Sequence, residues 1–171
     1  MNEHYFVKDT LDSLKKRLDN NESLLIQQDK GYVFNAKFSF NTPATQENIE
    51  EFCNQTGWTL PNDYQIFLKD NNGAKLFCDP FGSCVHLYSL EECIQNHLSY
   101  MEKEFIPIGY YLESYLFIDS NRVKNNREDY LLWFESGGKN YRELSINFAT
   151  WLDRLVMAQG AVFWDWPIYR S

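Results

Sequence analysis

The first forty residues change from a helical to a strand pattern of apolar positions. The apolar positions of the helical segment are Val7, Leu11, Leu14 and Leu18. Their spacing of four, three and four places them on one face of an amphipathic helix. The apolar run 24–26, the Lys30-Gly31 turn signal and the alternation over 32–40 predict a hairpin. The face of its second strand that we expect to be core consists of Tyr32, Phe34, Ala36, Phe38 and Phe40.

Two helices are predicted between residues 45 and 73. The inward residues are Ile49, Phe52 and Cys53 in the first helix and Tyr64, Phe67 and Leu68 in the second. Gly57 suits the C-cap of the first helix. Pro61 suits the first turn of the second helix, because a backbone N–H at that position would have no partner within the helix. Because the second helix offers Lys69 as its one basic residue, this pair is not predicted to read DNA.

A second hairpin and a capped helix are predicted after residue 74. Proline in Asp79-Pro80-Phe81-Gly82 favours a tight turn between strands at 75–78 and 83–88. The sequence Ser89-Leu90-Glu91-Glu92 is a capping box, in which the serine and the later glutamate satisfy each other's backbone donors. We expect this box to open a helix that continues through Met101.

The C-terminal half is predicted to hold three strands, a helix and an aromatic tail. Apolar runs at 105–110, 115–119 and 130–134 favour central strands covered on both faces, and Gly137-Gly138 indicates a turn. Ser145 is the expected N-cap of a helix that Gly160 ends. The buried stripe predicted for that helix is Phe148, Trp151, Leu152, Leu155 and Val156.

The aromatic tail allows two interpretations. Either it folds back to complete the core, or it forms a partner-facing patch, since aromatics beside an acid are enriched in binding hot spots. The side chains of that patch would be Trp164, Asp165, Trp166 and Tyr169.

Strands grouped without regular helical crossovers predict an α+β fold. We expect a mostly antiparallel central sheet of about five to seven strands with helices packed against it. The length of 171 residues suits a single domain. No run is apolar enough to span a bilayer and the first residues are not signal-like, which predicts a cytoplasmic protein without a membrane partner.

Acidic residues are concentrated in one segment. The net charge is −8, and residues 44–119 hold twelve acidic residues against three basic ones. Such a segment repels nucleic acid and attracts a basic protein partner, although a solvated surface that keeps the protein soluble would give the same count. We expect no nucleic-acid partner.

Catalytic and metal chemistry find little support. Cys84 and His86 share one strand face, but no third residue is evident to orient the histidine as a base. The thiols and imidazoles with zinc-ligand chemistry are Cys78, Cys84, His86, Cys93 and His97. Their spacing lacks the close pairs of structural zinc sites, so we expect buried free thiols, no disulfide, no metal and no cofactor. Adjacent carboxylates such as Glu91 and Glu92 point in different directions on a helix, so no hydrolase site is predicted.

Several segments follow a family pattern in order. They are Pro43-Ala44 before Ile49-Glu50, Leu60-Pro61-x-x-Tyr64-x-x-Phe67-Leu68-x-x-x-Asn72-Gly73, Pro107-Ile108-Gly109, the run 115–122, and Phe148-x-x-Trp151-Leu152. The chain thereby resembles the SUKH superfamily, with its yeast Smi and Knr cell-wall regulators and its bacterial branch. The resemblance covers roughly residues 43–158, between an N-terminal helix and hairpin (1–42) and the aromatic tail (159–171).

The resemblance implies a non-enzymatic α+β domain that binds proteins. Many bacterial members are immunity proteins, which neutralise a secreted polymorphic toxin, often a nuclease, by binding it. The yeast members suggest the alternative of a regulatory or scaffold adaptor. We therefore expect a basic toxin domain as partner, contacted by acidic helices and loops. The predicted contact residues are Asp70, Asp79, Glu91, Glu92, Glu102, Glu104 and Glu113.

Overall fold

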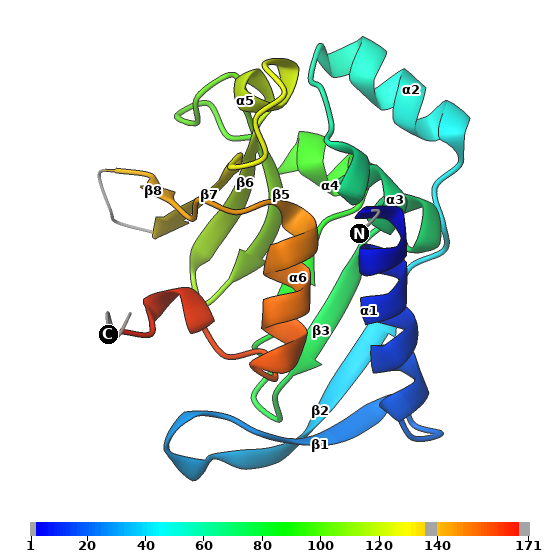
Figure 1. Cartoon of the computed structure of the whole chain (residues 1–171), viewed down its shortest axis with the longest axis vertical. Helices are drawn as coiled ribbons and strands as arrows, with labels where there is room; N and C mark the ends of the chain where they lie inside the picture. The colour runs from blue at the N-terminus through cyan, green and yellow to red at the C-terminus, as the bar shows by residue number, and fades with distance from the viewer. Residues whose placement is uncertain (1–2, 136–139, 168–171) are drawn as a thin grey trace.

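The computed structural model describes residues 3–135 and 140–167 (Figure 1). Its α-helices are α1 (Glu3–Arg17), α2 (Gln46–Thr56), α3 (Asn62–Asp70), α4 (Leu90–Gln95), α5 (Ser120–Lys124) and α6 (Phe148–Met157). Its strands are β1 (Ser23–Gln27), β2 (Val33–Phe40), β3 (Ala74–Cys78), β4 (Val85–Leu87), β5 (Phe105–Tyr111), β6 (Ser114–Asp119), β7 (Leu131–Glu135) and β8 (Arg142–Glu143). Two short 3₁₀ turns, η1 (Asp29–Gly31) and η2 (Phe163–Asp165), complete the assigned elements.

The strands form one antiparallel sheet in sequence order, β1 to β8. This confirms the α+β class and the antiparallel sheet, although eight strands exceed the five to seven expected. The extra strand is β8, whose two exposed residues Arg142 and Glu143 carry no apolar alternation that a pattern could reveal. Helix α5, between β6 and β7, is short and polar, so no apolar periodicity predicts it either. Asp119 caps it by accepting from the backbone N–H groups of Asn121 and Arg122.

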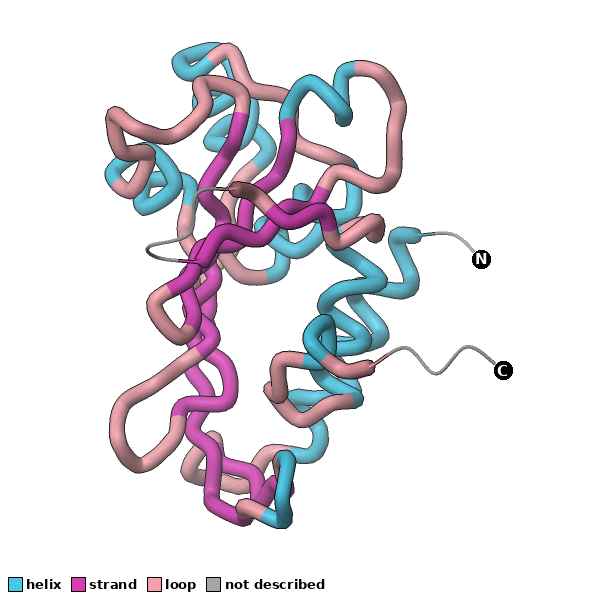
Figure 2. The backbone as a smooth tube through the Cα atoms, turned by 90° about the vertical axis from the view of Figure 1, so that its left-hand side faces the viewer, coloured by secondary structure: helices cyan, strands magenta, loops and turns pink. Residues whose placement is uncertain are grey.

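Helices α1 and α6 cover one face of the sheet, which Figure 2 shows nearly edge-on. Most of their predicted stripes are buried: Val7, Leu11 and Leu14 are fully enclosed, and Trp151 is 1% exposed. Leu18, the last predicted position of the first stripe, lies just beyond α1 and is half-buried. The opposite face carries a smaller apolar cluster of Met101, Phe117 and Leu132. Successive residues of β6 and β7 thus enter different clusters, which confirms central strands covered on both faces.

A buried carboxylate joins α3 to α6 and to the residue that precedes β7. Asp63, at the start of α3, accepts hydrogen bonds from the Tyr130 hydroxyl at 2.5 Å and the Ala149 backbone N–H at 2.8 Å. The Tyr130 hydroxyl in turn accepts from the Phe148 backbone N–H at 2.9 Å. Burial raises the pKa of Asp63, while these hydrogen bonds oppose the rise. The acid thus fixes the first turn of α6 against α3.

Local capping was predicted correctly at Ser89 and Gly57 and wrongly at Ser145. Ser89 forms its capping box, and Gly57 ends α2 with a left-handed φ of 72°. Thr45 forms a second capping box at the start of α2, which was not predicted. The N-cap of α6 is Asn147, not Ser145, because only the Asn147 side chain reaches the Thr150 backbone N–H. Helix α4 also ends at Gln95 rather than continuing to Met101. The Gly137-Gly138 turn lies outside the described residues.

The aromatic face predicted for residues 32–40 is core only in its middle. Phe34, Ala36 and Phe38 are buried, whereas Tyr32 precedes the strand and is 45% exposed. Phe40, the last residue of β2, is half-buried, and the Lys15 ammonium lies 4.8 Å from its ring centroid.

Candidate partner-binding surface

Most acidic residues of segment 44–119 carry a charge that no ion pair offsets. Among the described residues, the acids of this segment that contact a basic side chain are Asp70 with Lys15, Glu92 with His86 and Asp119 with Arg122. Asp63 is buried in the helical layer. The remaining acids, which make no ion pair within the described residues, are Glu47, Glu50, Glu51, Asp79, Glu91, Glu102, Glu104 and Glu113.

Three of the seven predicted contact residues have structural duties. Asp70 bonds the Lys15 ammonium at 2.8 Å and thereby ties α3 to α1. Burial alone would raise its pKa, but the hydrogen bond and charge of Lys15, with help from Asn71 and Lys8, lower it overall. Asp79 accepts from the backbone N–H groups of Phe81 and Ser83 and so closes the β3–β4 turn. Glu92 completes the α4 capping box at 2.8 Å from the Ser89 nitrogen.

The other four lie on three segments, because Glu102 and Glu104 share the loop between α4 and β5. Glu91 is exposed on α4, Glu102 is exposed in the loop that follows it, and Glu113 is exposed at the β5–β6 turn. Glu104 is half-buried, and its backbone carbonyl accepts from the Ser120 N–H. The structure therefore distributes the predicted set over several elements, and two of its exposed members, Glu91 and Glu113, line two different hollows.

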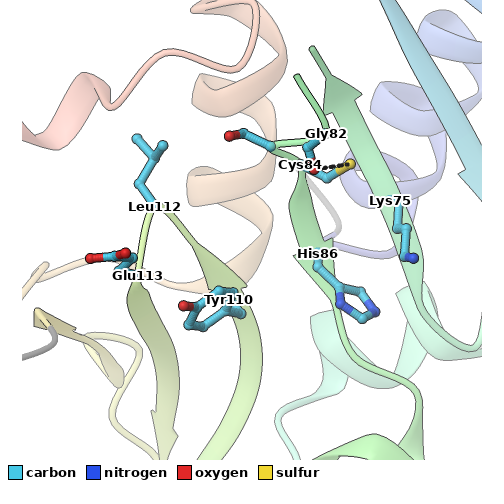
Figure 3. A pocket seen from close by; sticks show the side chains of 8 residues that line it. Lys75, Gly82, Cys84, His86, Tyr110, Leu112 and Glu113 are labelled. Carbon is cyan, nitrogen blue, oxygen red and sulfur yellow. Dashed lines mark hydrogen bonds between the residues drawn. The ribbon is translucent and has the colours of Figure 1, made fainter. Parts of the chain in front are cut away.

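The first hollow, here called the hairpin cleft, separates the β3–β4 hairpin from the β5–β6 hairpin (Figure 3). Its volume is about 640 Å³, and its lining comprises Lys75, Gly82, Ser83, Cys84, His86, Tyr110, Leu112 and Glu113. Strands β4 and β5 pair only at His86–Tyr110 and Leu87–Gly109. Beyond Tyr110 the two hairpins diverge, which opens the cleft.

A polar row forms the floor of the hairpin cleft. Register places Lys75, His86 and Tyr110 side by side on β3, β4 and β5, on the face away from α6. The His86 Nε2 atom lies 3.1 Å from a carboxylate oxygen of Glu92. Burial lowers the pKa of His86, and the negative charge of Glu92 opposes that shift. The tips of the two hairpins expose apolar side chains, with Phe81 86% exposed and Leu112 54% exposed.

The second hollow, here called the α2–α4 groove, has a volume of about 530 Å³. It is lined by Asn48, Glu51, Phe52, Gln55, Asn72, Leu90, Glu91, Ile94 and Gln95. Glu91 is the one predicted contact residue in this lining. Sequence reasoning counted Glu51 among the acids but did not select it, because the approach of α2 to α4 is a tertiary feature.

The cysteines correct one expectation and remove one catalytic option. Cys78 and Cys84 form a disulfide across the β3–β4 turn, with their Cα atoms 4.1 Å apart, whereas Cys53 and Cys93 are free thiols. The expectation of no disulfide was wrong because hairpin pairing brings these two residues together. The sulfur of Cys84 is therefore not available as a nucleophile beside His86.

No cluster of three or more potential metal ligands occurs in residues 3–135 and 140–167. Burial raises the pKa of the Cys93 thiol to about 12, which disfavours the thiolate that a metal would bind. A search of the same ranges found no helix with the length and apolar character that a membrane span requires.

The aromatic tail is divided between core and surface. The Trp164 ring packs 4.8 Å from Trp133 and 5.9 Å from Trp151, so this part folds back over the sheet and α6. Asp165 pairs with Arg142, and Trp166 is 45% exposed. Tyr169, the fourth member of the predicted patch, lies outside the described residues.

Comparisons with known proteins connect the chain to a family and to two relatives. The model of the SMI1 / KNR4 family (SUKH-1) matches residues 43–154. An uncharacterized protein of Bacillus subtilis strain 168, YobM, is 37% identical over 97% of this chain and 95% of its own length. A second uncharacterized protein of that organism, YnaB, is 32% identical over 76% of this chain and 88% of its own length.

Proposed function

The chain belongs to the SMI1/KNR4 (SUKH-1) family, and from that premise we propose that it is a protein-binding domain that neutralises a cognate toxic protein by occluding it. The observation that carries the proposal is the set of unpaired carboxylates in segment 44–119. Three of them, Glu51, Glu91 and Glu113, line two hollows of the size that a partner's side chains fill. A toxin domain that grips nucleic acid must be cationic, and an anionic surface attracts such a domain and competes for its binding site.

The partner would be bound by exposed acids, while the structural acids hold the surface in shape. Asp70, Asp79 and Glu92 already serve an ion pair, a turn and a helix cap. The side chains that are exposed and serve no ion pair, turn or helix cap within the described residues are Glu91, Glu102 and Glu113. A cationic partner that covered them would offset charge repulsion that the free protein retains, so association should be fast and weakened by salt.

The proposal is tested by measuring both neutralisation of the toxin in cells and the affinity of the protein for the toxin. The protein is co-expressed with the product of an adjacent secreted-toxin gene, and the affinity of the purified pair is measured by titration calorimetry across salt concentrations. Charge reversal at Glu91, Glu102 and Glu113 should abolish protection and weaken binding by about a hundredfold. Unchanged affinity in a folded triple variant would refute the anionic mechanism. The adaptor role would be favoured instead if the gene of this protein had no toxin gene beside it and the partner were a housekeeping protein.

A further inference from the structure

We propose that the α2–α4 groove is the site at which a partner inserts a short cationic, amphipathic helix. The inference rests on the proposed function and identifies the chemistry of the segment that the surface receives. It predicts a helix that presents one apolar side chain to the floor of the groove and Lys or Arg side chains to its rim.

Each wall of the groove is one face of a helix. The wall from α2 consists of residues spaced by three, one and three positions, namely Asn48, Glu51, Phe52 and Gln55. Leu90, Glu91, Ile94 and Gln95 are one face of α4. A third helix packs into the channel between two such faces by inserting its own side chains between theirs.

The floor is apolar and incompletely covered. Phe52 is 4% exposed and Leu90 is 7% exposed, so both belong to the core that supports the groove. Ile94 is 36% exposed, so part of its aliphatic surface faces solvent. Covering an exposed aliphatic side chain with a partner's Leu or Ile gains hydrophobic free energy, which a smooth charged surface would not supply.

The charges around the groove are of one sign. Glu51 and Glu91 are both in the lining, and no Lys or Arg is among the lining residues. The Glu91 carboxylate accepts from Gln95 at 3.3 Å but makes no ion pair among the described residues, and the same holds for Glu51. The lining of the hairpin cleft, in contrast, includes Lys75 as well as Glu113. Charge complementarity therefore assigns the cationic helix to the α2–α4 groove.

The groove is also held in shape before any partner arrives. The capping box of Thr45 and Asn48 fixes the start of α2, and that of Ser89 and Glu92 fixes the start of α4. The Asn72 side-chain oxygen accepts from the Leu90 backbone N–H at 3.0 Å, which anchors α4 to the turn after α3. A preorganised site loses less conformational entropy on binding than a mobile one.

The direct test uses a defined probe. An acetylated and amidated peptide of Lys, Leu and Ala, about 15 residues long so that it can form a helix, is titrated into the labelled protein and followed by NMR. We expect the backbone signal of Ile94 and the side-chain amides of Gln55 and Gln95 to shift first. A peptide with Glu in place of every Lys should leave them unmoved.

Variants separate the groove from general charge attraction. Glu51→Lys with Glu91→Lys should weaken peptide binding at least about tenfold, whereas Glu50→Lys with Glu135→Lys makes the same change in net charge outside the groove and should have a small effect. Ile94→Asn should also weaken binding without a change in charge. Equal affinity of both double variants, or no binding by the wild-type protein, would overturn the proposal.

Cell protection distinguishes this proposal from the function on which it rests. If the wild-type protein does not protect cells against the toxin encoded by the adjacent gene, the proposed function is refuted. The peptide titration then tests by itself whether the groove binds a cationic helix. Protection by Glu51→Lys with Glu91→Lys that equals wild-type protection refutes the groove as the partner's site while the proposed function stands. Loss of protection in that variant, but not in Glu50→Lys with Glu135→Lys, supports both.

Discussion

Segments 44–119 and 120–165 place their carboxylates in different surroundings. In the later segment, Arg122 joins α5 to β7 and β8 through Asp129 and Glu143, and Arg142 joins β8 to the tail through Asp165. In the earlier segment, helix ends are satisfied by caps, and eight acids lack an ion pair among the described residues. Three of the six acids in the later segment, Asp129, Glu143 and Asp165, are thus ion-paired, whereas eight of the twelve in the earlier segment are neither ion-paired nor buried within the described residues. The later segment therefore uses a larger share of its carboxylates to stabilise the fold, and the earlier segment leaves more of them available for a partner.

Asp63 is the buried acid of the acidic segment, at 2% exposed, and its replacement should have the largest effect. Asp63→Asn keeps the size of the side chain but turns an amide group toward N–H and hydroxyl donors, which leaves buried hydrogen bonds unmade. We expect a loss of roughly 3 kcal/mol in the free energy of unfolding, measured by urea denaturation. Tyr130→Phe should lower it by roughly 2 kcal/mol, because the Phe148 N–H also loses its acceptor. A loss below about 0.5 kcal/mol in both variants would contradict this account.

Arg122 should show the next largest effect, because its side chain is only 15% exposed and contacts several acids. Arg122→Gln leaves Asp119, Asp129 and Glu143 without their shared cation. It also removes the 2.8 Å bond to the Asp129 backbone carbonyl. We expect a loss of about 1.5 kcal/mol in the same denaturation experiment. Lys103→Gln removes an exposed cation from the acidic segment and is the matched control, with an expected change within about 0.5 kcal/mol.

The unpaired acids should prove nearly dispensable for stability. Glu51→Gln, Glu102→Gln and Glu113→Gln together should change the free energy of unfolding by less than about 0.5 kcal/mol, or raise it slightly as repulsion decreases. Because salt screens the same repulsion, added NaCl should stabilise the wild-type protein more than the triple variant. A loss of stability as large as that of Arg122→Gln would show that these acids have structural partners, and would remove the contrast between the segments.

The sequence predicted what depends on local pattern and missed what depends on distant contacts. Periodicity located α1, α6 and the central strands, and capping chemistry located α2 and α4. Strand β8 has two polar residues, so only its pairing with Trp133 and Leu132 defines it. The Cys78–Cys84 disulfide could have been inferred from the predicted hairpin, which ends one strand at Cys78 and resumes near Cys84. The α2–α4 groove could not, because nothing local indicates that the Glu51 face approaches α4.

The smallest expected effect concerns the pKa of Asp129, an ion-paired acid of segment 120–165. Arg127 Nε donates a hydrogen bond to an Asp129 carboxylate oxygen at 2.9 Å. This bond lowers the pKa of Asp129 to about 2. A lowered folded-state pKa contributes stability above the pKa of an unfolded aspartate, roughly 3.9, and that contribution is lost as the pH falls toward 2. NMR titration of the Asp129 carboxyl signal should show this midpoint, and Arg127→Gln should raise it. An ordinary midpoint in the wild-type protein would mean that solvent screens the pair, so that Asp129 resembles the unpaired acids of the other segment.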